Sequence, residues 1–127
     1  MKSRSANDKY YRNKADELFM APYRGQPCEV CGSSKGTVFH HNVNKARSKA
    51  LRYDVKNGTT LCPSCHVFGN KLCAHSKNIF AVEAYVKWFQ WTRPQQYRYC
   101  KENQHIQRKY SYKQAWENMK EGREAWI

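Results

Sequence analysis

The sequence predicts a small α+β domain that is built around a zinc site and surrounded by helices at both ends. The chain contains two Cys-x-x-Cys pairs, Cys28/Cys31 in PCEVCG and Cys62/Cys65 in LCPSCH. Two short β-type runs lie between these pairs, and helical periodicity dominates on either side. Because only 40% of the 127 residues are hydrophobic, the core is small and a metal ion would contribute useful folding energy.

The two cysteine pairs supply four thiolates, the number that a closed tetrahedral zinc site takes. Gly32 supplies the turn of a metal knuckle, and Pro63 lies near the first turn of a helix that Cys62 is predicted to open. A structural zinc ion would join the knuckle to the helix, the arrangement called a treble clef. The paired spacing favours thiolates on metal in a reducing cytoplasm over disulfides, so Cys73 and Cys100 are predicted to be spare, half-buried thiols.

Residues 1–22 are predicted to form a basic N-terminal helix. Its apolar residues recur at helical spacing: Tyr11, Ala15, Leu18 and Phe19. Two interpretations of this helix stay open, because it could contact nucleic acid or only pack on the core.

Residues 23–92 are predicted to contain the zinc site, two short strands and a following helix. A β-branched and aromatic run at residues 37–39 predicts the first strand, which leads into His40 and His41. The second strand is predicted at residues 59–61, directly after an Asn-Gly turn.

Residues 42–53, between these strands, are predicted to be a long loop that is functional or disordered. Beyond the zinc site, Asn78 is predicted to cap a helix. The core face of this helix is predicted to carry apolar residues at spacings of 3, 4 and 3: Ile79, Val82, Val86 and Phe89. Its aromatic segment 88–91 is predicted to join the core instead of forming a base-stacking platform.

Residues 93–127 are predicted to be a helical C-terminal extension of the same structural domain. Pro94 ends one helix and is tolerated at the first position of the next. Ser111 and Gln114 fit a capping box that starts a last helix. One side of that helix is apolar: Ala115, Trp116 and Met119.

The chain carries 23 Lys and Arg against 10 Asp and Glu, a net charge of +13. A protein this basic usually binds a polyanion, and a 14% aromatic content favours nucleic acid over a membrane surface. The sequence has no apolar run of the ~20 residues that a membrane span needs. The N-terminal residues are not expected to be a signal peptide, so a cytoplasmic location is expected.

Three of the five histidines lie at motif positions, namely His40, His41 and His66. Adjacent strand residues point to opposite faces, so His40 and His41 could divide the work, one ring binding a metal and the other a water. His66 directly follows a zinc ligand and could meet a strand histidine at a second, open metal site. A single histidine is more commonly a surface or core residue, but this combination indicates metal-dependent chemistry.

The order Cys-x-x-Cys, FHH, Asn57 and LCPSCH resembles the HNH endonuclease family, whose ββα-metal hairpin and helix hold a catalytic divalent cation. KADELF before the knuckle and LRYDVKNGTTLCPSCH after the histidines are similar to NinG-type phage recombination endonucleases. The resemblance covers roughly residues 14–90. It implies a phage protein that processes or recombines DNA in the host cytoplasm.

The resemblance implies a role for each matching residue. His41 takes the general-base position, and His40 takes the metal-ligand position before it, where many relatives have Asp. Asn57 takes the position that braces the hairpin loop and orients the base, and His66 takes that of the second metal ligand. Two residues are candidates for a third ligand: Asn70, one helical turn later, and His75.

In the implied mechanism, a neutral His41 takes a proton from water, and hydrolysis leaves 5′-phosphate and 3′-hydroxyl ends. The catalytic cation is expected to be Mg²⁺ or Mn²⁺, with Ni²⁺ and Zn²⁺ as further candidates. Because Mg²⁺ prefers oxygen ligands, two imidazoles would favour Mn²⁺, Ni²⁺ or Zn²⁺ in vitro. The loop carries four basic residues that either contact DNA phosphates or are solvated: Lys45, Arg47, Lys49 and Arg52. Without a base-reading helix, strong sequence specificity is not expected.

The sequence therefore predicts a small treble-clef domain with an HNH-type hairpin-helix core that nicks or cleaves DNA with a divalent metal. Two alternatives remain. A non-catalytic, zinc-stapled DNA-binding module would not need His41, and a zinc protein that binds RNA or the ribosome explains the histidines least. DNA is the expected partner, together with a possible second copy or a phage DNA-processing protein, and neither a membrane nor a small-molecule substrate is expected.

Overall fold

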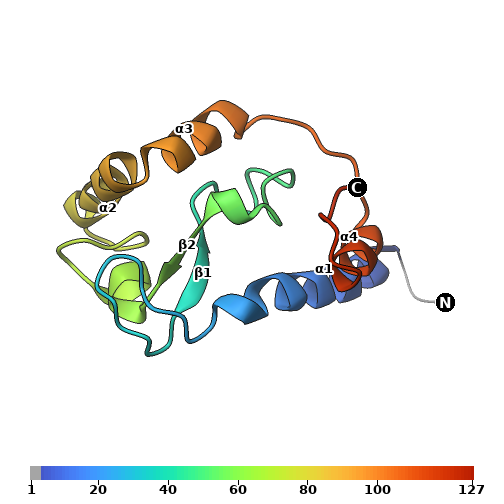
Figure 1. The fold of residues 1–127 in the computed structure, drawn as a ribbon, viewed down its shortest axis with the longest axis horizontal. Coiled ribbons are helices and arrows are strands. Elements are labelled where there is room, and N and C mark those ends of the chain that lie inside the picture. The colour runs from blue at the N-terminus through green and yellow to red at the C-terminus, as the bar shows by residue number, and fades with distance from the viewer. Residues whose placement is uncertain (1–3) are drawn as a thin grey trace.

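The computed structural model describes residues 4–127. A two-stranded antiparallel hairpin lies at its centre, between α1 on one side and α2 and α3 on the other (Figure 1). The helices are α1 (Arg4–Met20), α2 (Ile79–Thr92), α3 (Pro94–Asn103) and α4 (Tyr112–Lys120). The strands are β1 (Val38–His41) and β2 (Gly58–Leu61). Three short helical turns complete the fold: η1 (Ala21–Tyr23), η2 (Val55–Asn57) and η3 (Ser64–Phe68). The small α+β class that the sequence predicts is confirmed.

The hairpin register places His41 opposite Gly58 and His40 opposite Thr59. A glycine is required opposite His41, because a Cβ on Gly58 would lie 1.8 Å from the Phe39 ring. This close approach lets Phe39 pack beside His41, with their ring centroids 4.9 Å apart. The glycine at position 58 therefore makes room for the Phe39 ring at the end of the hairpin that carries the two histidines.

The hairpin separates two apolar clusters. The first lies between the hairpin, α1 and α4: Ala15, Phe19, Phe39, Tyr53, Tyr110, Ala115 and Ala125. The second surrounds the cysteine pairs and includes α2 and α3: Cys28, Leu61, Cys62, Cys65, Tyr85, Phe89 and Cys100. Because each cluster is small, cysteines of the two Cys-x-x-Cys pairs form a large part of the second core: Cys28, Cys62 and Cys65.

The first and last helices pack together, with α4 lying beside α1 (Figure 1). Ala15 and Ala115 are both fully buried, so the two helices approach closely, and the rings of Tyr11 and Trp116 are 5.7 Å apart. Ser111 caps α4 by accepting a hydrogen bond from the Gln114 backbone, as its sequence predicts.

The predicted core face of α2 is wrong for Ile79 and Val86 and right for Phe89, and Val82 is half-buried. Ile79 is 72% exposed and Val86 is 42% exposed, while Ala81 and Tyr85 are buried together with Phe89. The buried stripe has spacings of 4 and 4, which are as helical as the predicted ones, and its side chains face the cysteine cluster and the hairpin. The aromatic segment 88–91 joins the core only in part, as Trp88 packs on the core whereas Trp91 is 79% exposed.

The loop of residues 42–53 has no regular helix or strand, but it is packed and not disordered. Leu51 is fully buried, and Ser48 and Ala50 are almost so. The helix after Cys62 is short, because η3 ends at Phe68 and Gly69 follows in an extended conformation. A Cβ on Gly69 would lie 2.2 Å from the Ser64 carbonyl oxygen, so glycine is needed at this stop. Cys73 and Cys100 are buried, not half-buried.

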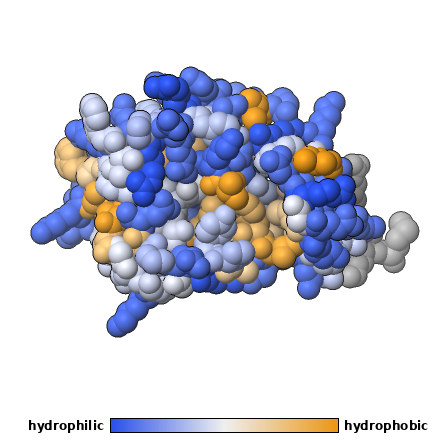
Figure 2. Space-filling view, viewed as in Figure 1, coloured by the Kyte–Doolittle hydropathy of each residue, from blue (hydrophilic) through white to orange (hydrophobic). Residues whose placement is uncertain are grey.

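The face in Figure 2 is largely hydrophilic, with apolar residues gathered near the middle of the molecule. Within residues 4–127, no helix has the length and apolar character that a bilayer crossing requires.

Candidate metal centres and active site

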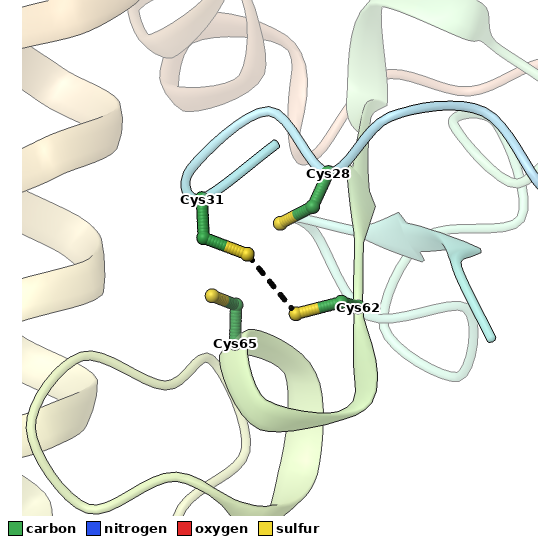
Figure 3. A group of neighbouring side chains, drawn as sticks. All are labelled: Cys28, Cys31, Cys62 and Cys65. Carbon is green, nitrogen blue, oxygen red and sulfur yellow. Dashed lines mark hydrogen bonds between the residues drawn. The ribbon is translucent and has the colours of Figure 1, made fainter. Parts of the chain in front are cut away.

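The four cysteines predicted to bind zinc come together in one cluster. Cys28 and Cys31 lie on the loop before β1, Cys62 follows β2 and Cys65 lies in η3, and their side chains converge (Figure 3). Their sulfur atoms all lie within 4.8 Å of one another, and the sulfurs of Cys31 and Cys62 are 3.4 Å apart. This spacing suits four thiolates around one tetrahedral zinc ion.

The first cysteine pair has the backbone of a metal knuckle. Gly32 adopts φ +83° and donates its N–H to the Cys28 carbonyl at 2.8 Å, while the Cys28 N–H binds the Ser33 carbonyl at 2.8 Å. Burial opposes ionisation of Cys28, but N–H groups of Cys31, Cys62 and Val30 outweigh it and lower the pKa of this thiol to about 7. A thiolate is the metal-binding form, so the lowered pKa prepares Cys28 to bind zinc. Burial raises the pKa of Cys65, whose proton a zinc ion would have to displace.

A second cluster consists of three histidines on three segments. His40 lies in β1, His66 in η3 and His75 in the irregular segment between η3 and α2. Their ring centroids are 4.8–5.2 Å apart, and each ring offers a nitrogen within 4.8 Å of the others. His75 is brought back to His66 by its own N–H, which donates to the His66 carbonyl at 2.8 Å.

This cluster has the properties of an open metal site. His40 is buried, His66 half-buried and His75 exposed, so one side faces solvent. Among the described residues, Nδ1 of His40 is one of two buried side-chain polar atoms without a hydrogen-bond partner, which a metal ion would satisfy. Burial and the neighbouring histidines lower the pKa of His40, so its ring is neutral and able to bind metal.

The two candidate third ligands differ in position. His75 belongs to the histidine cluster, whereas Asn70 is exposed and does not line the cavity beside it. The Asn70 backbone carbonyl instead accepts a hydrogen bond from Asn78, which caps α2. The chain therefore leaves the histidine cluster after Gly69 and comes back to it at His75.

His41 lies next to the histidine cluster but outside it. Its Nε2 is 2.8 Å from the Arg52 carbonyl oxygen. A carbonyl only accepts, so Nε2 carries the proton and Nδ1 keeps the lone pair in the neutral ring. Burial, supported by the charges of Lys45 and Arg52, lowers the pKa of His41 to about 4. The ring is therefore neutral at pH 7 and has a basic nitrogen.

His41 and the histidine cluster share one cavity of about 300 Å³. Its wall is formed by residues from α1, the hairpin, the loop and η3: Met20, Val38, Phe39, His40, His41, Asn44, Lys45, His66 and His75. A basic nitrogen, a candidate metal site and an exposed lysine thus meet at one opening.

Asn57 is fully buried and holds the loop of residues 42–53 at two points. Its Oδ1 accepts from the Val43 N–H at 2.7 Å, and its Nδ2 donates to the carbonyls of Val43 at 3.0 Å and Leu51 at 3.1 Å. Leu51 directly precedes Arg52, whose carbonyl holds His41. Asn57 therefore fixes the loop beside the candidate base without lining the cavity.

The four basic loop residues have different environments. The side chain of Arg52 is only 11% exposed. Its guanidinium forms a bidentate ion pair with Asp16, so its charge is paired inside the protein. Lys49 donates to the Tyr110 carbonyl at 2.7 Å. Lys45 and Arg47 are exposed, and Lys45 lies at the cavity that contains His41.

Two residues that support the site, Tyr85 and Asp16, were not predicted from the sequence. Tyr85 on α2 packs its ring against His40, with centroids 5.4 Å apart, and its hydroxyl donates to Asn42 at 2.6 Å. Asp16 on α1 binds the side chains of both Arg52 and Tyr53. The signal for Asp16 was an acidic residue within a basic helix, which alone does not indicate a partner.

Residues 28–68 match the model of the HNH endonuclease family. The matched segment contains both cysteine pairs, the hairpin, Asn57 and His66, but it ends before His75 and begins after α1. No curated protein and no solved structure matches the chain significantly. The match and the two clusters together indicate a nuclease or DNA-binding role that involves metal.

Proposed function

We propose that this protein is a metal-dependent HNH endonuclease that hydrolyses phosphodiester bonds of DNA, with His41 as the general base. The observation that carries the proposal is the hydrogen bond between Nε2 of His41 and the Arg52 carbonyl, beside the cavity shared with the three histidines. This bond fixes the tautomer in which Nδ1 accepts a proton. A non-catalytic DNA-binding module would not need that arrangement.

In the proposed reaction, Nδ1 of His41 takes a proton from a water molecule as the water oxygen attacks phosphorus. The bond between phosphorus and the 3′ oxygen breaks, the leaving 3′ oxygen takes a proton from solvent water, and His41 later returns its proton to solvent. The products have 5′-phosphate and 3′-hydroxyl ends. The protonated ring keeps its Nε2–H bond to the Arg52 carbonyl, so the developing positive charge stays next to a carbonyl dipole. The lowered pKa keeps the ring unprotonated at neutral pH, while the bond to the Arg52 carbonyl raises the pKa and so favours the protonated ring.

His40, His66 and His75 would hold the catalytic cation. When bound, a divalent cation stabilises negative charge on the phosphate oxygens as a Lewis acid. Three imidazoles favour Mn²⁺, Ni²⁺ or Zn²⁺ over Mg²⁺, which prefers oxygen ligands. The four cysteines would hold a structural zinc ion that joins the knuckle to η3 and thereby fixes His66 beside His40.

Lys45 and Arg47 are the proposed phosphate contacts of the loop, because both are exposed and Lys45 lines the cavity. Contacts of this kind position the duplex but do not read its sequence. A setting in phage DNA processing or recombination stays a prediction that rests on the KADELF and LRYDVKNGTTLCPSCH segments alone.

Plasmid nicking tests the proposal. Zinc-loaded protein is incubated with supercoiled DNA and Mn²⁺, Ni²⁺ or Mg²⁺, and His41→Ala is compared with His105→Ala, an exposed histidine outside the cavity. We expect nicking by the wild type and His105→Ala, and a loss of about 100-fold or more in His41→Ala. Equal rates in both variants would remove His41 as the base. Binding without nicking under every metal would leave a DNA-binding module.

A further inference from the structure

The N-terminal helix reaches the candidate active site through one carboxylate. Asp16 accepts two hydrogen bonds from the Arg52 guanidinium, at 2.8 Å from Nε and 2.6 Å from Nη2. It also accepts one from the Tyr53 hydroxyl at 2.7 Å. The Arg52 and Asp16 side chains are only 11% and 16% exposed, so this bidentate pair is shielded from water and held in a single geometry.

Arg52 connects this carboxylate to the base. Its side chain is fixed on Asp16, while its backbone carbonyl accepts the Nε2–H of His41 at 2.8 Å. Because both groups belong to one residue, the position of the carbonyl depends on where the guanidinium is held. Residues 42–53 contain no regular helix or strand, so the Arg52 backbone is held by a single turn, in which its N–H donates to the Lys49 carbonyl at 3.2 Å, together with side-chain contacts of this kind.

The neighbouring residue strengthens the attachment. Tyr53 donates its hydroxyl to Asp16, and its ring lies 5.6 Å from that of Phe19, one helical turn further along α1. The Phe19 ring is also 6.3 Å from His41. Two successive loop residues and the base are thus all in contact with the same face of α1.

Another ion pair on the same helix provides a comparison. Glu17, next to Asp16, binds Arg24 with a bidentate geometry that includes a 2.7 Å bond. Glu17 and Arg24 are both exposed, and neither residue lines the cavity that contains His41. The Glu17–Arg24 pair resembles the Asp16–Arg52 pair in geometry, but it is not connected to His41.

We propose that Asp16 is a positioning residue for His41, acting through Arg52, and that α1 is therefore part of the nuclease although it lies outside the segment that matches the family. The role in catalysis rests on the proposed function, whereas the effect on the His41 ring does not. Without the carboxylate, the Arg52 carbonyl is free to shift, and the imidazole loses the contact that fixes its tautomer. A misplaced base is less effective even when DNA still binds.

The test compares Asp16→Asn with Glu17→Gln, two changes that each neutralise one carboxylate on α1. Single-turnover nicking is measured at saturating DNA, together with DNA affinity and zinc content. We expect Asp16→Asn to lower the rate by about tenfold or more, with DNA affinity within about twofold of the wild type. Glu17→Gln should retain the wild-type rate.

A second readout is independent of activity. Histidine-selective ¹⁵N NMR of the zinc-loaded protein reports which ring nitrogen carries the proton. We expect Nε2–H for His41 in the wild type and in Glu17→Gln, and a mixture of tautomers in Asp16→Asn. If Asp16→Asn does not fold, Asp16→Glu takes its place, because it keeps the charge but displaces the guanidinium by one methylene.

The two readouts separate the possible failures. An unchanged His41 tautomer together with an unchanged nicking rate in the Asp16 variant would overturn the positioning role. If the wild type does not nick DNA but the Asp16 variant alters the tautomer, the positioning role stands and the proposed nuclease function fails. A rate loss that persists at equal size in a His41→Ala background would also overturn the proposal, since the effect would not pass through His41.

Discussion

Replacing Asn57 with Ala should cost both stability and activity. The side chain is fully buried and forms three hydrogen bonds with the backbone, one from the Val43 N–H and two to the carbonyls of Val43 and Leu51, besides a weak one from the Cys100 thiol. Each bond contributes about 1 kcal/mol, and leaving its backbone partner unpaired in a buried position raises that cost. The substitution should therefore lower the free energy of unfolding by about 3–5 kcal/mol.

Urea unfolding followed by tryptophan fluorescence, with zinc present, measures this change. The matched control is Asn118→Ala, because Asn118 is also buried and donates to two carbonyls, those of Ala125 and Ile127, far along the chain from the site. Both variants should be destabilised. At a temperature where both are folded, only the Asn57 variant should nick DNA slowly, since it alone loosens the loop that holds His41.

Either of two results would refute this reasoning. A loss below about 1 kcal/mol in Asn57→Ala would mean that the three buried bonds do not brace the loop. Equal nicking by folded Asn57→Ala and Asn118→Ala would mean that the brace does not influence the base.

Three further predictions follow from the geometry of the site. Gly58→Ala should destabilise the protein by about 1–3 kcal/mol in thermal unfolding, because its Cβ would lie 1.8 Å from the Phe39 ring; an unchanged midpoint would disprove the tight contact. Lys45→Ala and Arg47→Ala should each weaken DNA binding and reduce the slope of log K against log salt concentration by about 1, and a slope equal to that of the wild type would exclude a phosphate contact. His41 has its pKa lowered to about 4 in the fold, so its neutral form stabilises the protein above the unfolded pKa of 6.5, and this stability is lost as the pH falls towards 4. Between pH 7 and pH 5 the wild type should lose about 2 kcal/mol more than His41→Gln in urea unfolding, and parallel losses would contradict the shift.

The parts of the fold that local sequence fixes were predictable. The spacing within each Cys-x-x-Cys pair lets both sulfurs approach one metal ion, independently of the rest of the fold. The four sulfur atoms lie together as predicted. The strand ends at His41 and the caps at Asn78 and Ser111 depend on neighbouring residues only. Predictions of this kind need no knowledge of tertiary packing.

The remaining features depend on partners distant in sequence. Two stripes of α2 have helical spacing, and only the packing of Tyr85 against the histidine and cysteine clusters selects the buried one. The charge of Arg52 does not reveal whether it faces solvent or a carboxylate 36 residues away. His75 lies in an irregular segment without periodicity, so the sequence could only offer it beside Asn70 as a third ligand, and its ring distances and backbone bond to His66 place it in the cluster.

The division between structural and catalytic ligands is most directly tested by the nicking activity of folded His66→Ala. Cys65 and His66 are adjacent, but one belongs to the thiolate cluster and the other to the histidine cluster. We expect His66→Ala to keep its structural zinc and its fold while nicking falls to background, whereas Cys62→Ala should unfold because structural zinc contributes folding energy. Wild-type nicking by His66→Ala, or its unfolding in the manner of Cys62→Ala, would contradict the division.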